Sequence, residues 1–183
     1  RTDLALESAQ AVKASGTGSE LPDGVELSSS NEDGLLVTDV LVKTADASNK
    51  IGKPTGRYLS LEPELPLDTA LGNAEAAARV ISRYLSELLG EVKKDENVLV
   101  VGLGNYSITP DSLGPRVSEH IFATRHIRIS EPELFEDGMG SVCSIIPGVM
   151  GETGLEPQEL ILPLLSEIKF DALIAVDALA CAN

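Results

Sequence analysis

The sequence predicts an α/β protein, with a mainly parallel sheet flanked by helices and an N-terminal region that contains β-strands. Two observations carry this prediction. Short apolar runs rich in β-branched residues, such as Val98–Val101, are too short for helices and are typical of strands buried on both faces. These runs alternate with segments whose apolar residues repeat every three to four positions, and such alternation gives parallel strands joined by right-handed crossovers.

The N-terminal part of the chain is expected to be irregular and then β-rich. Residues 1–14 have the pattern of a weak amphipathic helix, and residues 15–33 are rich in Gly, Ser, Asp and Glu, which predicts an exposed loop. Apolar, β-branched runs at 35–43 and 57–61 predict two strands, with a turn-rich segment at 44–56 between them.

A long amphipathic helix is predicted next, from about residue 68 to Leu88, with Gly90 as its stop signal. It leads into the strand at Val98–Val101. We expect residues 1–66 to form an N-terminal region with the remnant of a pro-segment, and residues 67–183 to form an α/β core, within one structural domain.

The remaining elements follow from the same signals. Proline at the first turn, followed by apolar residues at helical spacing, predicts two helices, and apolar runs predict strands. The predicted elements are a helix from Pro115, a short strand at 127–129, an acidic loop at 131–140, a strand at 141–146, a helix from Pro157 and a strand at 172–176.

A glycine-rich loop, Gly102-Leu103-Gly104, follows the strand at Val98–Val101. A dinucleotide-binding loop needs a third glycine at the right spacing, and a phosphate-binding loop needs Gly-Lys-Ser/Thr; both are absent here. Two alternatives remain. The loop is either an ordinary tight turn or a catalytic loop that holds Asp111 at the carboxyl end of a strand, where open α/β sheets place their sites.

A second acidic residue, Asp177, directly follows the predicted strand at 172–176. Because the carboxyl ends of parallel strands share one edge of a sheet, Asp111 and Asp177 are expected in the same crevice. There one acid could hold a proton while the other activates water. Backbone N–H groups of two glycine loops are candidates for stabilising an oxyanion, although the same loops could be turns without a catalytic role. The candidate residues of these loops are Gly102, Gly104, Asn105, Gly148 and Gly151.

The composition argues against several classes of function. The chain of 183 residues has 14 Lys and Arg against 29 Asp and Glu, a formal net charge of -15, which argues against direct binding of nucleic acid or an anionic membrane. No apolar run is long enough for a membrane span and no signal peptide is visible, so we expect a cytoplasmic protein. Cys143, Cys181, His120 and His126 lack metal-ligand or triad spacing, so no metal and no cofactor is predicted.

Several short blocks together resemble the spore germination protease family of endospore-forming bacteria. They occur in order over nearly the whole chain, which makes the resemblance specific. The blocks are Arg1–Ala5, Gly56–Tyr58, Val100–Asn105, Thr109–Pro115, Thr124–His126, Ile146–Gly151 and Ala175–Ala180.

The resemblance implies an endopeptidase of the spore core that degrades small acid-soluble spore proteins during germination, with a zymogen stage and a homotetramer. It implies a phosphorylase/hydrolase-like fold and two essential aspartates at Asp111 and Asp177. The family is in turn similar to hydrogenase-maturation peptidases, which use their acids around a metal. Both aspartic-type and metal-assisted water activation therefore remain open, and a non-catalytic module that binds a nucleotide or peptide is the rival from another class.

The resemblance also bears on the two ends of the chain. Family substrates are cut after an acidic residue that precedes a bulky apolar residue and alanine, and Asp3-Leu4-Ala5 has that order. This predicts self-processing between Asp3 and Leu4, while the simpler alternative is that Asp3 caps a helix. Family members continue well beyond the Asp177 block, so we expect the core to be incomplete at its C-terminus.

Overall fold

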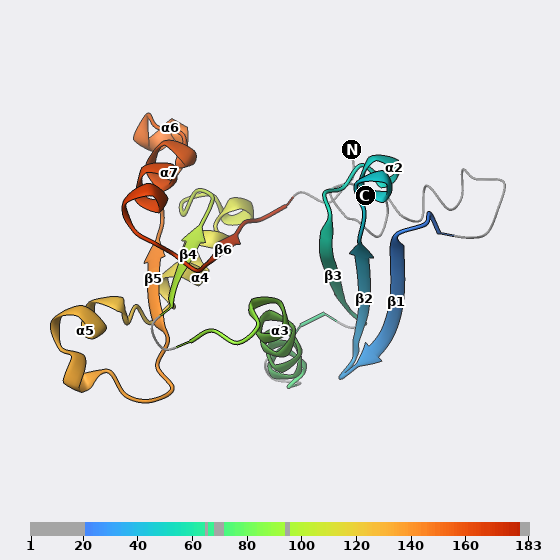
Figure 1. Cartoon of the computed structure of the whole chain (residues 1–183), viewed down its shortest axis with the longest axis horizontal. Helices are drawn as coiled ribbons and strands as arrows, with labels where there is room; N and C mark the ends of the chain where they lie inside the picture. Colours follow the sequence, from blue (N-terminus) through green and yellow to red (C-terminus); the bar gives the residue numbers. More distant parts are fainter. Residues whose placement is uncertain (1–20, 65, 68–71, 94–95, 180–183) are drawn as a thin grey trace. The chain divides into compact units, whose positions relative to one another are not determined.

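The computed structural model describes residues 21–64, 66–67, 72–93 and 96–179 (Figure 1). The described residues fall into two compact units, one up to Leu88 and one from Leu89 onward. The predicted boundary between residues 66 and 67 lies within the first unit, and that domain assignment stays a prediction. The predicted helix at 1–14 and the proposed Asp3–Leu4 bond lie outside the described residues.

The first unit contains a three-stranded antiparallel sheet in the order β1-β2-β3, with β1 at Val25–Glu32, β2 at Leu35–Val42 and β3 at Gly56–Pro63. The predicted loop at 15–33 is wrong over its second half, because that half is strand β1. A two-residue turn, Asp33-Gly34, joins β1 to β2, and both residues have positive φ, 52° and 79°. Positive φ at both positions matches the twist of a tight hairpin, which is why Asp-Gly is favoured there.

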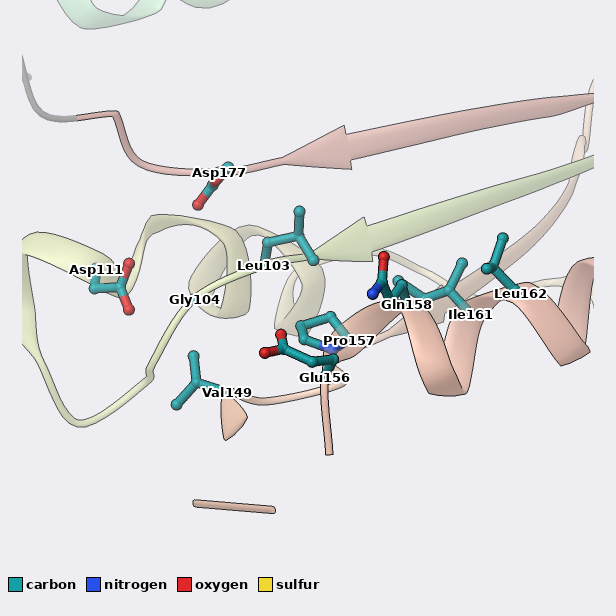
Figure 2. Close-up of a pocket in the computed structure, with 10 residues that line it drawn as sticks. All are labelled: Leu103, Gly104, Asp111, Val149, Glu156, Pro157, Gln158, Ile161, Leu162 and Asp177. Atoms are coloured by element: carbon teal, nitrogen blue, oxygen red, sulfur yellow. The ribbon is translucent and has the colours of Figure 1, made fainter. Parts of the chain in front are cut away.

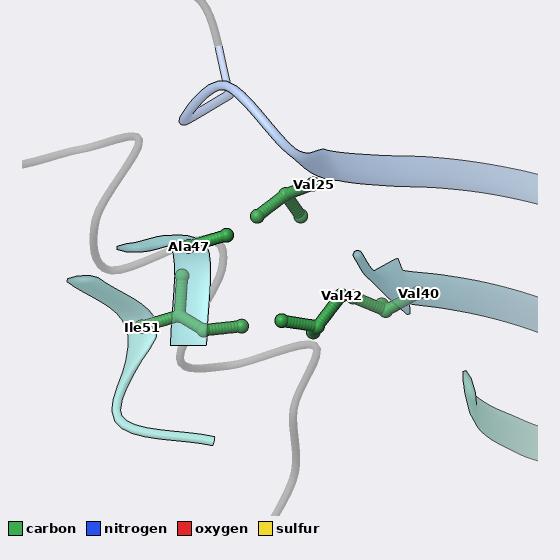
Figure 3. Close-up of a cluster of buried hydrophobic side chains, with 5 residues drawn as sticks. All are labelled: Val25, Val40, Val42, Ala47 and Ile51. Atoms are coloured by element: carbon green, nitrogen blue, oxygen red, sulfur yellow. The ribbon is translucent and has the colours of Figure 1, made fainter. Parts of the chain in front are cut away.

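Two helices cover opposite faces of this sheet. Helix α2, Ala45–Ile51, packs on Val40 and Val42, as Figure 3 shows, and it occupies part of the segment predicted to be turn-rich. Helix α3, Asn73–Leu89, packs on Leu35 and Val37 of the same strand. Strand β2 is therefore buried on both faces, because alternate residues of a strand point to opposite sides.

Helix α3 confirms the predicted long helix, and Gly90 follows its end. Its buried residues are Ala77 and Val80, whereas Ile81, Leu85 and Leu88 are exposed. Two of its charged residues pair with the sheet: Arg83 with Glu32 of β1, and Glu87 with Arg57 of β3.

The second unit contains the predicted parallel sheet, in the order β5-β4-β6. Its strands are β4 at Asn97–Gly102, β5 at Ser141–Ile145 and β6 at Ala172–Val176, which confirms the strands predicted at 98–101, 141–146 and 172–176. Strand β4 is the central strand, and each of its residues Val98–Val101 is buried. At its start, the Asn97 N–H donates to Asp171. The Lys169 ammonium and, after it, this Asn97 bond hold the pKa of the Asp171 carboxyl below its usual range.

Short helices connect these strands, and one of them corrects the sequence prediction. The predicted strand at 127–129 is wrong, because these residues lie in helix α5, Arg125–Ser130. Ile127 and Ile129 alternate with a polar residue, as they would in a strand. In the structure the segment is helical, and from this helix the Arg128 guanidinium donates to Asn97 Oδ1 at 3.0 Å. The connecting elements are η1 (Thr109–Asp111), α4 (Leu113–Glu119), α5 (Arg125–Ser130), η2 (Pro132–Leu134), α6 (Met150–Thr153) and α7 (Pro157–Glu167), the last beginning at the predicted proline.

Helix α4 packs across β4, and glycines on both elements make this possible. A Cβ atom on Gly114 of the helix would overlap the carbonyl oxygens of Leu103 and Val176. A Cβ atom on Gly102 of the strand would overlap the Gly114 carbonyl and the Ser118 hydroxyl. The start of α4 is thereby held against the carboxyl ends of β4 and β6.

We predict that Gly114→Ala destabilises the protein by about 1–3 kcal/mol, the usual cost of overpacking a close contact. The opposing atoms are backbone carbonyls, which cannot move aside as a flexible side chain would. Gly140→Ala is the matched control, since its nearest neighbouring atom would lie at an ordinary 3.9 Å. Urea unfolding of both variants measures the effect, and equal stability of the two would contradict this account of the packing.

Candidate active site

The loop after β4 folds back onto Asp111. Gly104 has a φ of +116°, a conformation that side chains rarely adopt, and a Cβ atom there would overlap the Asp111 carbonyl oxygen. The chain then makes a single turn of 3-10 helix, η1, which ends at Asp111. Gly104 therefore allows the loop to close tightly enough to bring Asp111 beside the end of the strand.

Asn105 fixes the Asp111 carboxylate. Its backbone N–H donates to Asp111 Oδ2 at 2.7 Å, and its side-chain Oδ1 accepts from the Ser107 N–H at 2.8 Å. Asn105 is only 9% exposed, so these bonds are shielded from competing water. The predicted role of this N–H was oxyanion stabilisation, whereas in the structure it is bonded to Asp111.

Asp177 lies at the end of the neighbouring strand. It follows β6 directly, and its Oδ1 accepts from the Ala178 N–H at 2.8 Å. The carbonyl of Val176, the residue before it, accepts from the Leu103 N–H at 2.8 Å, which ties the end of β6 to the loop that leads to Asp111. Adjacent parallel strands thus deliver both acids to one edge of the sheet.

Asp111 and Asp177 line the same pocket, which has a volume of about 480 Å³. Figure 2 shows both carboxyl groups turned toward the space beside Gly104, with Glu156 entering from another side. The volume is within the range of roughly 300–1,000 Å³ that is usual for ligand sites. The remaining lining is mainly apolar: Leu103, Val149, Pro157, Ile161 and Leu162, with Gln158.

The predicted loop residues occupy different places around this pocket. Gly104 lines it, while Gly102 is the last residue of β4 and packs against α4. Gly148 has a φ of +74° and lies against Thr153, and Gly151 is in the short helix α6. Neither belongs to the lining, although Val149, which lies between them, does.

The α7 side of the pocket was not foreseen from the sequence. Its helix was predicted from Pro157, but no spacing rule showed that Gln158, Ile161 and Leu162 face the two aspartates. One sequence signal was available: residues four apart lie on one helix face, which groups Pro157 with Ile161 and Gln158 with Leu162. Deciding which face of the helix lines the pocket requires the position of the helix in the structure.

Cys143, His120 and His126 are not among the residues that line this pocket, and Cys181 lies outside the described residues. Cys143 is on β5, where burial raises the pKa of its thiol against the opposing effect of Arg125 and Arg128. His120 follows α4, and its Nδ1 contacts the Arg116 carbonyl oxygen at 2.8 Å. Over the described ranges, no three His, Cys, Asp or Glu side chains are grouped as a metal site, and no described helix is long and apolar enough to cross a membrane.

Comparison with known proteins identifies the family. The germination protease family matches residues 3–183. A germination protease of Caldanaerobacter subterraneus subsp. tengcongensis is 41% identical over 180 residues, which is 98% of this chain and 54% of that protein. Germination proteases of Bacillus cereus and Bacillus cytotoxicus are 40% and 39% identical over 187 residues, covering all of this chain and 50% of each relative. The chain thus spans about half the length of these relatives, and it belongs to the germination protease family.

Proposed function

We propose that this protein is an endopeptidase in which Asp111 and Asp177 activate a water molecule. The observation that carries the proposal is that two acids 66 positions apart in the sequence line one pocket at the carboxyl edge of a parallel sheet. Paired acids of this kind, one protonated and one ionised, are a recurring arrangement for activating a water molecule.

In the proposed reaction the pair shares one proton. The ionised carboxyl group takes a proton from water as the water oxygen bonds to the peptide carbonyl carbon, and the protonated one donates a hydrogen bond to the carbonyl oxygen. The C–N bond then breaks as a proton passes from the pair to the leaving amine, which restores the starting state. Backbone N–H groups around Gly104 and in the 148–151 loop are proposed to stabilise the oxyanion, and Asn105 is proposed to position Asp111.

The proposed substrates are small acid-soluble spore proteins, degraded in the spore core during germination. Support comes from the membership of the germination protease family and from relatives named germination protease. The net charge of -15 also favours a polypeptide substrate over the DNA that such proteins cover. A phosphorylase/hydrolase-like fold, a zymogen stage and a homotetramer belong to the same proposal.

We predict that Asp111→Asn and Asp177→Asn each lower peptide hydrolysis by about 10²–10⁴-fold, the usual contribution of a positioned acid or base. Asp171→Asn is the matched control, because it makes the same change at the opposite end of β6, outside the pocket. The measurement is kcat/KM on a spore-protein peptide, with circular dichroism to confirm folding. Full activity in both pocket variants would rule out the acid pair.

The same assay, repeated with a chelator, separates the two forms of water activation. A metal-assisted peptidase loses activity with chelator and regains it when a divalent cation is added back. An aspartic-type reaction is unaffected. Tight peptide or nucleotide binding without any hydrolysis would instead favour the non-catalytic binding module.

We also predict self-processing at the N-terminus. A chain that carries Arg1 to Asp3, incubated at mildly acidic pH, should yield a new N-terminus at Leu4, because protonation of Asp3 weakens any helix cap that it makes and frees the bond. The Asp111→Asn variant should remain uncut. Intact mass and N-terminal sequencing decide the matter, and a new terminus elsewhere would show that this segment is not a substrate of the enzyme.

A further inference from the structure

One arginine contacts the loop that carries Asp111 without lining the pocket. Arg116 lies on helix α4, two residues after Gly114. It is exposed, and no carboxylate of the described residues forms an ion pair with it. An exposed arginine is ordinary on a protein surface. The side chain of this one, however, makes two contacts, and each falls on a residue next to the hydrogen bond that fixes Asp111.

The first contact is with Tyr106. The Arg116 guanidinium lies over the Tyr106 ring, 5.1 Å from its centroid, which is within the distance at which a cation and an aromatic face attract each other. Tyr106 directly follows Asn105, whose backbone N–H donates to the Asp111 carboxylate. This contact therefore holds the early limb of the loop, beside the donor of that bond.

The second contact is with Ser112. The Arg116 Nε–H donates to Ser112 Oγ at 3.0 Å, and the Ser112 hydroxyl donates in turn to the Thr109 carbonyl oxygen at 3.0 Å. Ser112 is buried, so water competes little for these bonds. Because Ser112 directly follows Asp111, this contact holds the late limb of the loop, beside the acceptor.

The two contacts together close the loop around the Asn105–Asp111 bond. One guanidinium reaches the residue after the donor and the residue after the acceptor, so it ties both limbs to helix α4. The helix is itself fixed, since Gly114 seats its start against the carboxyl ends of β4 and β6. Without this tie the loop can still form its own hydrogen bonds, but it opens more readily, and the Asp111 carboxylate spends less time in one position.

We infer that Arg116 is a positioning residue, which clamps residues 105–112 through Tyr106 and Ser112 and thereby keeps the Asp111 carboxylate in place for cleavage. The inference rests on the proposed function, because it assumes that Asp111 takes part in hydrolysis. It adds a cation that serves the reaction without touching the substrate. Since neither Arg116 nor Tyr106 lines the pocket, their loss is expected to lower kcat and to leave KM unchanged.

Kinetics of the full-length protein on a spore-protein peptide test the clamp. Arg116→Ala removes both contacts and should lower kcat by about tenfold, whereas Tyr106→Leu removes only the ring and should lower it by about threefold. Tyr106→Phe keeps the ring and should restore kcat to within about twofold of the wild-type value. Arg79→Ala is the matched control, because it removes an exposed arginine from helix α3 of the first unit, which supplies no residue to the pocket.

A double variant tests whether Arg116 and Tyr106 act as one unit. Arg116→Ala combined with Tyr106→Leu should lose no more kcat than Arg116→Ala alone, because the ring then has no cation left to hold. Losses that multiply would show two independent effects and contradict the clamp.

Hydrogen exchange gives a readout that does not depend on activity. Mass spectrometry of the segment 104–111 should show its amides exchanging about tenfold faster in Arg116→Ala than in the wild-type protein, since the segment opens more readily. The Arg79→Ala variant should exchange at the wild-type rate in this segment. Faster exchange throughout the second unit, and not only in this segment, would show general destabilisation and overturn the positioning role.

The outcomes separate this inference from the proposed function. If the wild-type protein cuts the peptide and Asp111→Asn does not, but Arg116→Ala keeps full kcat or changes only KM, the clamp is wrong and the proposed function stands. Unchanged exchange of the segment 104–111 in Arg116→Ala has the same meaning. Where Arg116→Ala folds poorly, Tyr106→Leu decides, and full kcat in that variant overturns the inference. If the wild-type protein cuts no peptide, both fail together.

Discussion

The close approach of backbone to backbone at Gly102, Gly104 and Gly114 is the constraint on which the second unit depends. At each of these positions a Cβ atom would overlap a carbonyl oxygen of a neighbouring segment. Two of these contacts seat helix α4 on the ends of β4 and β6, and the third closes the loop onto Asp111. Since protein interiors are as tightly packed as organic crystals, such contacts cannot be relieved by a small shift. The glycines therefore set the shape of the edge where the acids lie.

The two acids are held in different ways. The Asp111 carboxylate accepts a bond from the N–H of Asn105, six residues earlier, so its position depends on the fold of a whole loop. Asp177 accepts from the N–H of the very next residue and follows a strand that is hydrogen-bonded to β4, so its position depends on the register of the sheet. Both the loop and the sheet edge must form before the two acids meet in one pocket, which is typical of sites built at strand ends of α/β sheets.

The sequence predicted correctly the elements with a clear pattern, which is apolar residues at helical spacing in helix α3 and a uniform apolar run in two strands. Strands β4 and β6 are short apolar runs, and the acids that follow them could be placed at one sheet edge by topology alone. Strand β1 was missed because its serines and glutamates suggest a loop, and it is paired through its backbone; the Asp33-Gly34 turn was the available signal. The α7 side of the pocket was missed because only three-dimensional packing decides which face of α7 meets the acids, and Ile161 looks like any core residue in the sequence.

Every residue that lines the pocket, from Leu103 to Asp177, belongs to the second unit. A rigid rotation of one unit against the other leaves all distances within a unit unchanged. Hinge motion of this kind therefore cannot separate the two carboxyl groups, and a rearrangement that moves them apart has to deform the second unit itself. Separation of facing groups by domain movement, which is open to sites that lie between domains, is closed to this pair of acids.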